Sequence, residues 1–298
     1  MSVHRFLTAL LRNPKHLVGH RNIFLFSHMR AYTSLFGHIL GSHPQIEGYY
    51  EMQIGYYSWK SLWRQKLLYL GTHDVKPASG FMFDKILHNE LTVAPEILSR
   101  DSVRALFALR KPASTISSIV QLYRKVDPEH PYTHPDRAQA YYVERLSGLC
   151  RLAERLAGRF YYLDAEALVD EPEQVLGDLS AWLHLASPLT TEYQLFENTG
   201  KPRAGDSSDK IKSGKIAQAT RPPSIEGFSP ALLEQAEAVY DECRACLLRL
   251  SDTAFRLGSE YAWETGQVRF DAGGVATTVE RAITAAWRPI VQTNRRVP

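Results

Sequence analysis

Several kinds of feature are scarce in this chain. Its 298 residues include three cysteines, and its formal net charge is only +3. An odd, low cysteine count excludes a disulfide framework and fits a reducing compartment. So small a net charge does not indicate a nucleic-acid-binding or membrane-surface protein, and no apolar run approaches the ~18 residues of a membrane span. We therefore expect a soluble cytoplasmic protein without a nucleic-acid partner.

The rest of the composition is that of an ordinary globular protein. The chain is 44% hydrophobic, 22% charged and 11% aromatic, which excludes disordered, collagen-like and low-complexity architectures. The small net charge still leaves room for a local basic pocket that binds one polyanionic small molecule.

Short apolar segments alternate with segments of helical spacing along the chain. The predicted buried strands are 22–27, 80–83, 103–109 and 159–163. The predicted helices are 34–40, 113–125, 136–158, 173–184 and 230–250. This alternation is typical of an α/β fold with a central parallel sheet. We expect one domain over 1–265 and a C-terminal extension, 266–298, of unknown role.

Two predicted strands run through a polar turn directly into a helix. Arg30, Thr33 and Ser34 follow the first strand, and Arg110 and Ser118 follow the strand 103–109. Strand ends of this kind present backbone N–H groups and a helix dipole to an anion. Because such ends meet at one edge of a parallel sheet, the two turns together suit a ligand with two anionic groups. Alternatively, the hydroxyls are ordinary helix caps and Arg30 lies at the surface.

The first turn resembles a loop of the sulfotransferases that use 3′-phosphoadenosine 5′-phosphosulfate (PAPS). That loop reads Pro-Arg/Lys-Ser-Gly-Thr-Thr/Ser and is followed by a helix and His-Pro; here 29–34 reads Met-Arg-Ala-Tyr-Thr-Ser, with His43-Pro44 at the expected distance. Arg30, Thr33 and Ser34 match. Tyr32 stands where the family has glycine, and we expect a helical backbone there, which tyrosine tolerates.

Two later segments extend the resemblance over about 22–216. Residues 110–118 (Arg-Lys-Pro-Ala-Ser-Thr-Ile-Ser-Ser) are similar to the family's 3′-phosphate motif, Arg-Asp-Pro-Arg-x-x-x-x-Ser, although Lys111 and Ala113 depart from it. Residues 164–172 are similar to the family's Tyr-Glu-Asp-Leu-Val-x-x-Pro segment. The resemblance implies a P-loop-NTPase-like three-layer fold and transfer of a sulfuryl group from PAPS, leaving 3′-phosphoadenosine 5′-phosphate (PAP), with no metal required.

The resemblance also assigns catalytic roles. Glu51 stands where related enzymes carry the glutamate base, with Glu47 as second candidate. Lys85, just after the strand 80–83, would stabilise the sulfuryl group beside Arg30, with Lys76 as its rival. The loop 205–215 is similar to one that closes over the nucleotide. The implied cofactor-binding residues are Arg30, Ala31, Tyr32, Thr33, Ser34, Arg110, Ser118, Ser207, Ser208, Lys212 and Lys215.

Other features have simpler interpretations. Cys243 and Cys246 lie on one apolar helix face without a second ligand pair, which favours core packing over zinc or redox chemistry. Trp59 and Trp63 have helical spacing that is also typical of a core. Aromatic residues after Glu51 could instead build a pocket for a phenol or lipid alcohol, so the expected partner is a small-molecule acceptor with a hydroxyl or amine.

Two rival functions stay open. A nucleotide-dependent kinase would need magnesium ligands and normally a Gly-Lys-Ser/Thr loop, but Gly214-Lys215 is followed by Ile216. A non-catalytic nucleotide-binding module would fit the altered loop positions.

Overall fold

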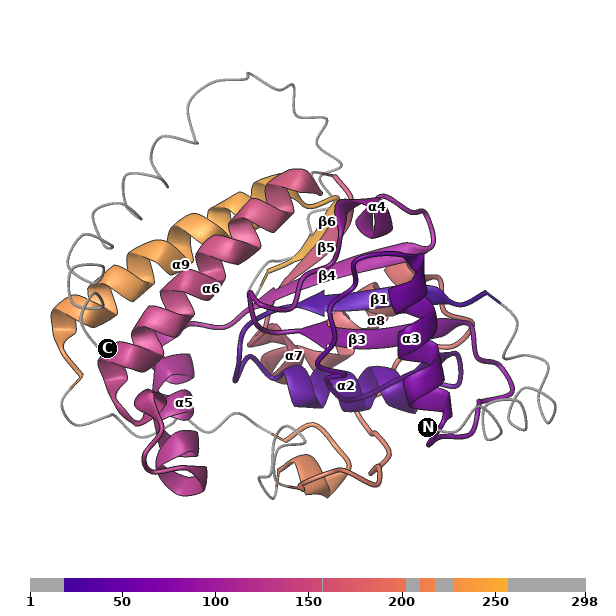
Figure 1. Cartoon of the computed structure of the whole chain (residues 1–298), viewed down its shortest axis with the longest axis horizontal. Helices are drawn as coiled ribbons and strands as arrows, with labels where there is room; N and C mark the ends of the chain where they lie inside the picture. The colour runs from indigo at the N-terminus through magenta and orange to yellow at the C-terminus, as the bar shows by residue number, and fades with distance from the viewer. Residues whose placement is uncertain (1–18, 157, 202–209, 218–227, 257–298) are drawn as a thin grey trace, which may run out of the picture. The chain divides into compact units, whose positions relative to one another are not determined.

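A six-stranded, all-parallel sheet organises the chain (Figure 1). The computed structural model describes residues 19–156, 158–201, 210–217 and 228–256. The strands lie in the order β2-β3-β1-β4-β5-β6. Their bounds are β1 Arg21–Phe26, β2 Ile46–Glu47, β3 Phe81–Ile86, β4 Val103–Leu109, β5 Phe160–Asp164 and β6 Thr253–Phe255.

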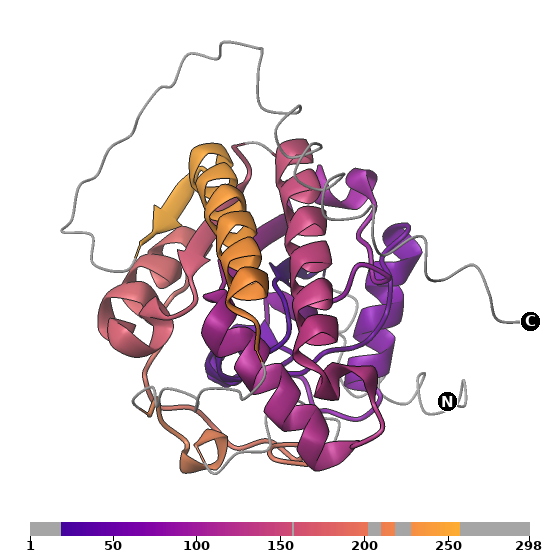
Figure 2. The same cartoon turned by 90° about the vertical axis from the view of Figure 1, so that its left-hand side faces the viewer.

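Helices cover both faces of the sheet. Successive side chains of a strand point to opposite faces, so Phe24 and Phe26 pack with α5, α6 and α9, whereas Ile23 and Leu25 pack with α2, α7 and α8. Figure 2 turns the layer of α5, α6 and α9 toward the viewer. Burial on both faces explains why the strands are mostly apolar. The helices are α2 Thr33–Ser42, α3 Trp59–Leu70, α4 Pro95–Leu98, α5 Pro112–Val126, η2 Pro131–Thr133, α6 Pro135–Arg155, α7 Ala167–Asp170, α8 Pro172–Leu183, η3 Ile211–Ser213 and α9 Pro230–Leu250.

The strand order reverses at β1. After β1 the chain builds β2 and β3 on one side, then crosses to build β4, β5 and β6 on the other. Phe26, the last residue of β1, pairs with Ile86 of β3 and Phe107 of β4, so the three strands end close together. In open α/β sheets, ligands bind outside the carboxyl ends of the strands at such a switch point.

The predicted α/β three-layer fold is confirmed, with corrections to its elements. The strand 103–109 and the helix 230–250 have the predicted bounds. The strand predicted at 80–83 runs instead from Phe81 to Ile86, so Asp84 and Lys85 lie within it rather than after it. The short strands β2 and β6 were not predicted. The proposed boundary between 265 and 266 lies outside the described residues.

The interpretation of the cysteines and that of the tryptophans have opposite outcomes. Cys243 and Cys246 are buried in the core beside α6, and the Cys243 thiol lies 3.5 Å from the carbonyl oxygen of Leu146. The core prediction is wrong for Trp59 and Trp63, which are 56% and 38% exposed. Their helix, α3, buries its opposite face.

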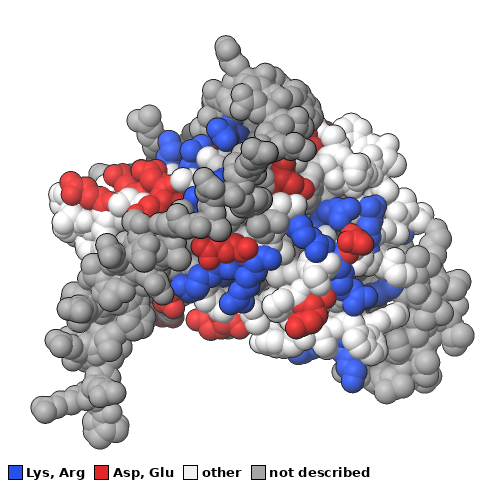
Figure 3. All heavy atoms as spheres, turned by 90° about the horizontal axis from the view of Figure 1, so that it is seen from above, with Lys and Arg blue, Asp and Glu red and all other residues white. Residues whose placement is uncertain are grey.

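The surface shows no dominance of one charge. In Figure 3, basic and acidic side chains lie interspersed on the face seen from above, in keeping with the net charge of +3. Within the described ranges, no helix combines the length and apolar character that crossing a bilayer requires.

Candidate active site

Two arginines and a serine meet at the switch point. The Arg30 Nε donates to the Ser118 Oγ over 2.8 Å, and an Nη of Arg110 donates to the carbonyl oxygen of Arg30 over 2.8 Å. The turn after β1 is therefore joined directly to the segment after β4 by contacts between residues 80 and 88 positions apart in sequence. The Arg110 Nε is buried and has no hydrogen-bond partner among the described residues. The structure brings three predicted phosphate-binding residues together.

Tyr32 contradicts the helical backbone that we expected for it. Its φ is 55°, in the left-handed region, and φ of Arg30 is 65°. A non-glycine residue in this region costs on the order of 1 kcal/mol. The Arg110 guanidinium lies 4.4 Å from the centre of the Tyr32 ring, and this cation–π contact offsets part of that strain. Tyr32 thus replaces the flexibility of glycine with a ring that holds Arg110.

The helices α2 and α5 begin without a side-chain cap from their N-cap residues. Neither N-cap residue, Tyr32 for α2 or Lys111 for α5, makes a side-chain capping hydrogen bond. Ser114 donates instead to the carbonyl oxygen of Lys111. The first turns of α2 and α5 thus have backbone N–H groups suited to an anion at the switch point. Ala31 is buried in the core, so its side chain is structural.

A neutral histidine supports the second turn. The Arg110 backbone N–H donates to the His28 Nε2 over 3.0 Å, which leaves Nδ1 to donate to the carbonyl oxygen of Met29. Burial lowers the pKa of His28 to about 3, so the ring is uncharged at neutral pH. The segment 164–172 helps from the other side, because Glu166 accepts the Lys111 backbone N–H over 2.9 Å. Sequence reasoning missed His28.

Glu51 enters the site on a tightly packed loop after β2. Gly48 in this loop has a φ of +95°, and a Cβ there would lie 2.4 Å from the carbonyl oxygen of Phe83. The loop can therefore approach β3 only with glycine at this position. The Glu51 Oε1 is buried and has no hydrogen-bond partner in the described part of the chain. Burial raises the pKa of Glu51, and the charges of Lys85, His88 and Arg145 oppose that rise.

Lys85 and Asp84 place opposite charges beside Glu51. Lys85 is 2% exposed; burial lowers its pKa, and the charges of Glu51 and Asp84 oppose this. The fully buried Asp84 accepts hydrogen bonds from the Met52 N–H (2.9 Å), the Lys85 N–H (2.7 Å) and the Tyr56 hydroxyl (2.6 Å). Burial raises the pKa of Asp84 to about 7, and the charge of Glu51 adds to this rise, whereas the three hydrogen bonds lower the pKa. Asp84 thereby fixes the loop that carries Glu51.

Arg145, which sequence reasoning also missed, ties two strand ends together from α6. Its guanidinium donates to the carbonyl oxygens of Ser27 (2.8 Å) and Ile86 (2.5 Å) and to the side chain of Asn89 (2.8 Å). Burial lowers its pKa to about 10, so it stays charged at neutral pH. Arg145 adds a fixed positive charge near Glu51.

The second-choice candidates have structural contacts. Glu47 lies within β2 and accepts the Lys76 backbone N–H over 2.9 Å. The Lys76 ammonium donates to the carbonyl oxygens of Gly41, His43 and Ile46. All three of its hydrogens thus bind main chain around the end of α2, which favours Lys85 over Lys76.

The predicted nucleotide loop lies only partly within the described chain. Ser207 and Ser208 are outside the described residues. The Lys212 side chain lies against Gly200, and the main chains of Lys215 and Glu192 pair in an isolated antiparallel β-bridge. These contacts are with the segment that follows α8, and their part in cofactor binding stays a prediction.

The site combines the joined guanidinium groups of Arg30 and Arg110 with the buried pair of Glu51 and Lys85. Fixed cations suit a ligand with several negative charges, while a buried carboxylate beside a lysine suits proton removal. Among the described side chains, no three His, Cys, Asp or Glu residues are grouped so as to hold a metal ion.

Comparison with solved structures identifies the same architecture elsewhere. The sulfotransferase domain from the curacin biosynthetic pathway superposes with a TM-score of 0.51 at 15% identity, over 75% of this chain and 98% of that domain. The sulfotransferase domain of the Synechococcus PCC 7002 olefin synthase gives 0.46 at 14% identity, over 75% of this chain and 94% of that one. Retinol dehydratase in complex with retinol and PAP gives 0.39 at 12% identity, over 81% and 86%. No family model and no curated protein sequence matches the chain. The chain has the fold of the curacin sulfotransferase domain.

Proposed function

We propose that this protein is a sulfotransferase that moves the sulfuryl group of PAPS to a hydroxyl or amine of a small-molecule acceptor. The observation that carries the proposal is Glu51. Its buried, unpartnered oxygen lies at the switch point of a sulfotransferase fold, where it interacts with the charge of the buried Lys85. An orphaned carboxylate destabilises the folded state, so a role in binding or chemistry explains its presence.

Each group has a role in the proposed reaction. Glu51 removes the proton of the acceptor as the acceptor oxygen or nitrogen attacks sulfur. The S–O bond to the phosphate breaks in line, and the electron pair leaves with PAP. Lys85 stabilises the negative charge on the sulfuryl oxygens and the leaving phosphate.

The nucleotide is positioned by the two joined turns. Arg110 and Ser118 bind its 3′-phosphate, and the Arg30 hydrogen bond to Ser118 adds a second guanidinium to that subsite. Thr33, Ser34 and the first-turn N–H groups of α2 bind the 5′ end. This arrangement shifts Arg30 from the sulfuryl group, its role by resemblance, toward the 3′-phosphate. Lys85 then acts on the sulfuryl group with support from the charge of Arg145.

Calorimetry with two nucleotides separates the proposal from its rivals. We expect micromolar binding of PAP and much weaker binding of ATP with magnesium. Preference for ATP with magnesium would favour the kinase, and well-folded protein that binds neither would contradict the nucleotide site. PAP binding with turnover unchanged in Glu51→Gln would instead favour a different base or a purely binding role.

A further inference from the structure

Exposed apolar side chains gather on one short stretch of the chain. Among the described residues, six large hydrophobic side chains are exposed, and four of them lie between Tyr57 and Leu68. Tyr57 is 65% exposed, Trp59 56%, Leu68 40% and Trp63 38%. Single exposed apolar residues are ordinary on a protein surface, but a contiguous group marks an interaction site.

The orientation of α3 is fixed by polar contacts on its buried face. Gln65 accepts from the Asn22 side chain over 3.0 Å and donates to the carbonyl oxygen of Phe83 over 3.1 Å. These hydrogen bonds attach α3 to β1 and β3. Both ribbon views show α3 at the periphery of the sheet (Figures 1 and 2). Trp59 and Trp63, one turn apart, are held on the outer face.

The same helix carries positive charge only. Its sequence, WKSLWRQKLLYL, has three cations and no acidic residue; Lys60 and Arg64 are exposed, whereas Lys66 is buried. The Lys60 ammonium lies 6.0 Å from the centre of the Trp59 ring, and the Lys66 ammonium lies 5.2 Å from that of Trp63. We define the α3 face by its exposed aromatic, apolar and basic residues: Tyr57, Trp59, Lys60, Trp63, Arg64 and Leu68.

We infer that the α3 face docks on an anionic lipid surface. Tryptophan and tyrosine favour the headgroup level of a bilayer, and lysine and arginine beside them reach lipid phosphates. The exposed Lys60 and Arg64, with no acidic residue on the helix, give the face a positive charge that complements anionic headgroups. A protein partner, which Trp, Tyr and Arg would also suit, would leave vesicle binding absent. A helix that lies in the headgroup region of a bilayer requires neither a membrane-spanning segment nor a high net charge of the protein. The net charge of +3 is therefore compatible with docking.

The α3 face continues into the loop that carries Glu51. Tyr56 contacts Asp84 through its buried hydroxyl, and the next residue, Tyr57, is the most exposed of the aromatic and apolar side chains of the face. Docking would therefore bring the candidate active-site loop near the lipid headgroups. The docking inference goes beyond the proposed sulfuryl transfer and stands independently of it.

Vesicle sedimentation of the full chain tests the inference. We expect binding to phosphatidylcholine vesicles that contain one-third phosphatidylglycerol, and much weaker binding to phosphatidylcholine alone. Trp59→Ser with Trp63→Ser lowers the bound fraction about tenfold or more. Lys60→Glu with Arg64→Glu abolishes the preference for the anionic vesicles.

Matched controls come from exposed residues elsewhere on the molecule. Val126 and Leu195 are 56% and 55% exposed, so Val126→Ser and Leu195→Ser remove similar exposed apolar groups and leave vesicle binding unchanged. Lys125→Glu is the control for charge. Circular dichroism spectra and thermal midpoints that match wild type establish that the variants fold.

Three outcomes would overturn the inference. The first is that wild type does not bind anionic vesicles. The second is that the control variants and the α3 variants lose vesicle binding equally. The third is that the protein self-associates and the tryptophan variants abolish this self-association. The last would assign the face to a second copy of this chain. PAP calorimetry on the same samples keeps the two proposals apart, because the α3 variants retain nucleotide affinity if only docking is lost.

Discussion

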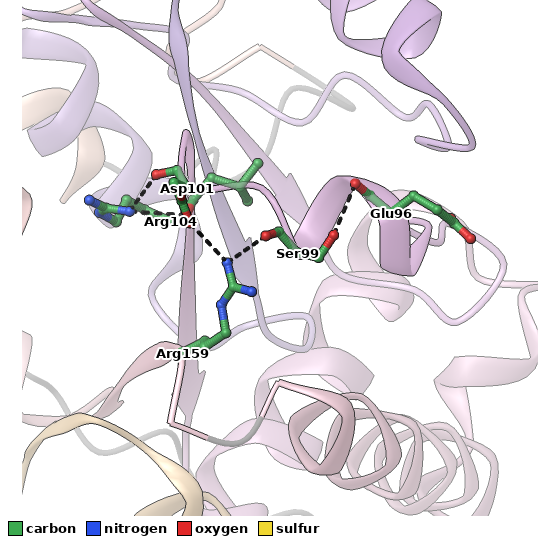
Figure 4. Close-up of polar contacts among 6 residues, drawn as sticks. Glu96, Ser99, Asp101, Arg104 and Arg159 are labelled. Atoms are coloured by element: carbon green, nitrogen blue, oxygen red, sulfur yellow. Dashed lines mark hydrogen bonds and ion pairs between the residues drawn. The ribbon is translucent and has the colours of Figure 1, made fainter.

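The two ends of the parallel strands hold charged side chains in different ways. At the amino ends of β4 and β5, Arg104 donates to the carbonyl oxygen of Asp101 over 2.9 Å, and Arg159 donates to that of Ser99 over 2.7 Å (Figure 4). At the carboxyl ends, Glu51 and Arg110 hold buried polar atoms without partners.

This difference distinguishes solvated charges from buried ones. An exposed arginine on a main-chain oxygen is solvated and contributes little to stability. A buried carboxylate or guanidinium with an unmade hydrogen bond destabilises the fold by about 1–3 kcal/mol. Of the four such atoms in the described part of the chain, three belong to Glu51, Arg110 and Glu166, which follow the carboxyl ends of strands, and the fourth belongs to Glu47 in β2, beside the start of β3.

The largest expected effect is on the candidate base. Glu51→Gln keeps the shape of the side chain but cannot accept a proton, so turnover falls about 10²–10⁴-fold. Turnover is measured as PAP formed from PAPS with a panel of phenols, alcohols and amines. The control is Glu96→Gln, at the amino end in α4, which leaves turnover unchanged. A Glu51→Gln enzyme with half of wild-type turnover would exclude Glu51 as the base.

The second effect concerns the lysine beside that base. Glu51 must be ionised to act, and its pKa is raised, so turnover declines on acidification at a higher pH than for an ordinary glutamate. The charge of Lys85 lowers the pKa of Glu51, so Lys85→Met moves this decline to still higher pH and reduces turnover about 10²–10³-fold. If Lys85→Met left the pH–rate profile unchanged, the electrostatic coupling between Lys85 and Glu51 would be contradicted. Lys125→Met on α5 is the control.

The third effect is on the pH dependence of stability. The pKa of Asp84 is about 7 in the folded chain and near 4 when unfolded. Between these values the folded state holds the extra proton, so this carboxyl lowers the free energy of unfolding as pH rises, by at most about 4 kcal/mol. Asp84→Asn removes this contribution, and its stability relative to wild type therefore increases from pH 4.5 to 7.5 in urea titrations. If the free energies of unfolding of wild type and Asp84→Asn depended on pH in the same way, the raised pKa of Asp84 would be refuted.

The smallest effect belongs to the amino end. Arg159 lies 3.8 Å from the carboxylate of Asp101, and both side chains are exposed. Arg159→Ala therefore changes the free energy of unfolding by less than about 1 kcal/mol and leaves PAP affinity unchanged. A larger loss of PAP affinity than in the carboxyl-end variants would remove the distinction between the two ends.

Sequence patterns predicted the elements better than the contacts between them. The strand 103–109 could be bounded from sequence because its apolar run ends at Arg110 and Pro112, where polarity and proline stop a strand. The turns that hold Arg30 and Arg110 could be located because each follows such a strand.

The missing parts of the site depend on contacts distant in sequence. Arg145 lies within an amphipathic helix, and its partner Ser27 is 118 residues away, so nothing local to α6 distinguishes it from a surface arginine. The sequence prediction ends the strand before Asp84, because a charged residue usually terminates a buried apolar run. The left-handed backbone of Tyr32 depends on its packing against Arg110, which the loop sequence does not reveal.

One titration tests the central claim, that the carboxyl ends of the strands bind a nucleotide with a 3′-phosphate. Arg110 and Arg104 lie at opposite ends of the same strand, so calorimetry with PAP on wild type, Arg110→Ala and Arg104→Ala compares the two ends directly. We predict that Arg110→Ala weakens binding about 10–100-fold, as loss of a charge-assisted hydrogen bond does, and that Arg104→Ala binds as wild type does. Equal affinities in all three proteins, or a greater loss in Arg104→Ala, would contradict the account.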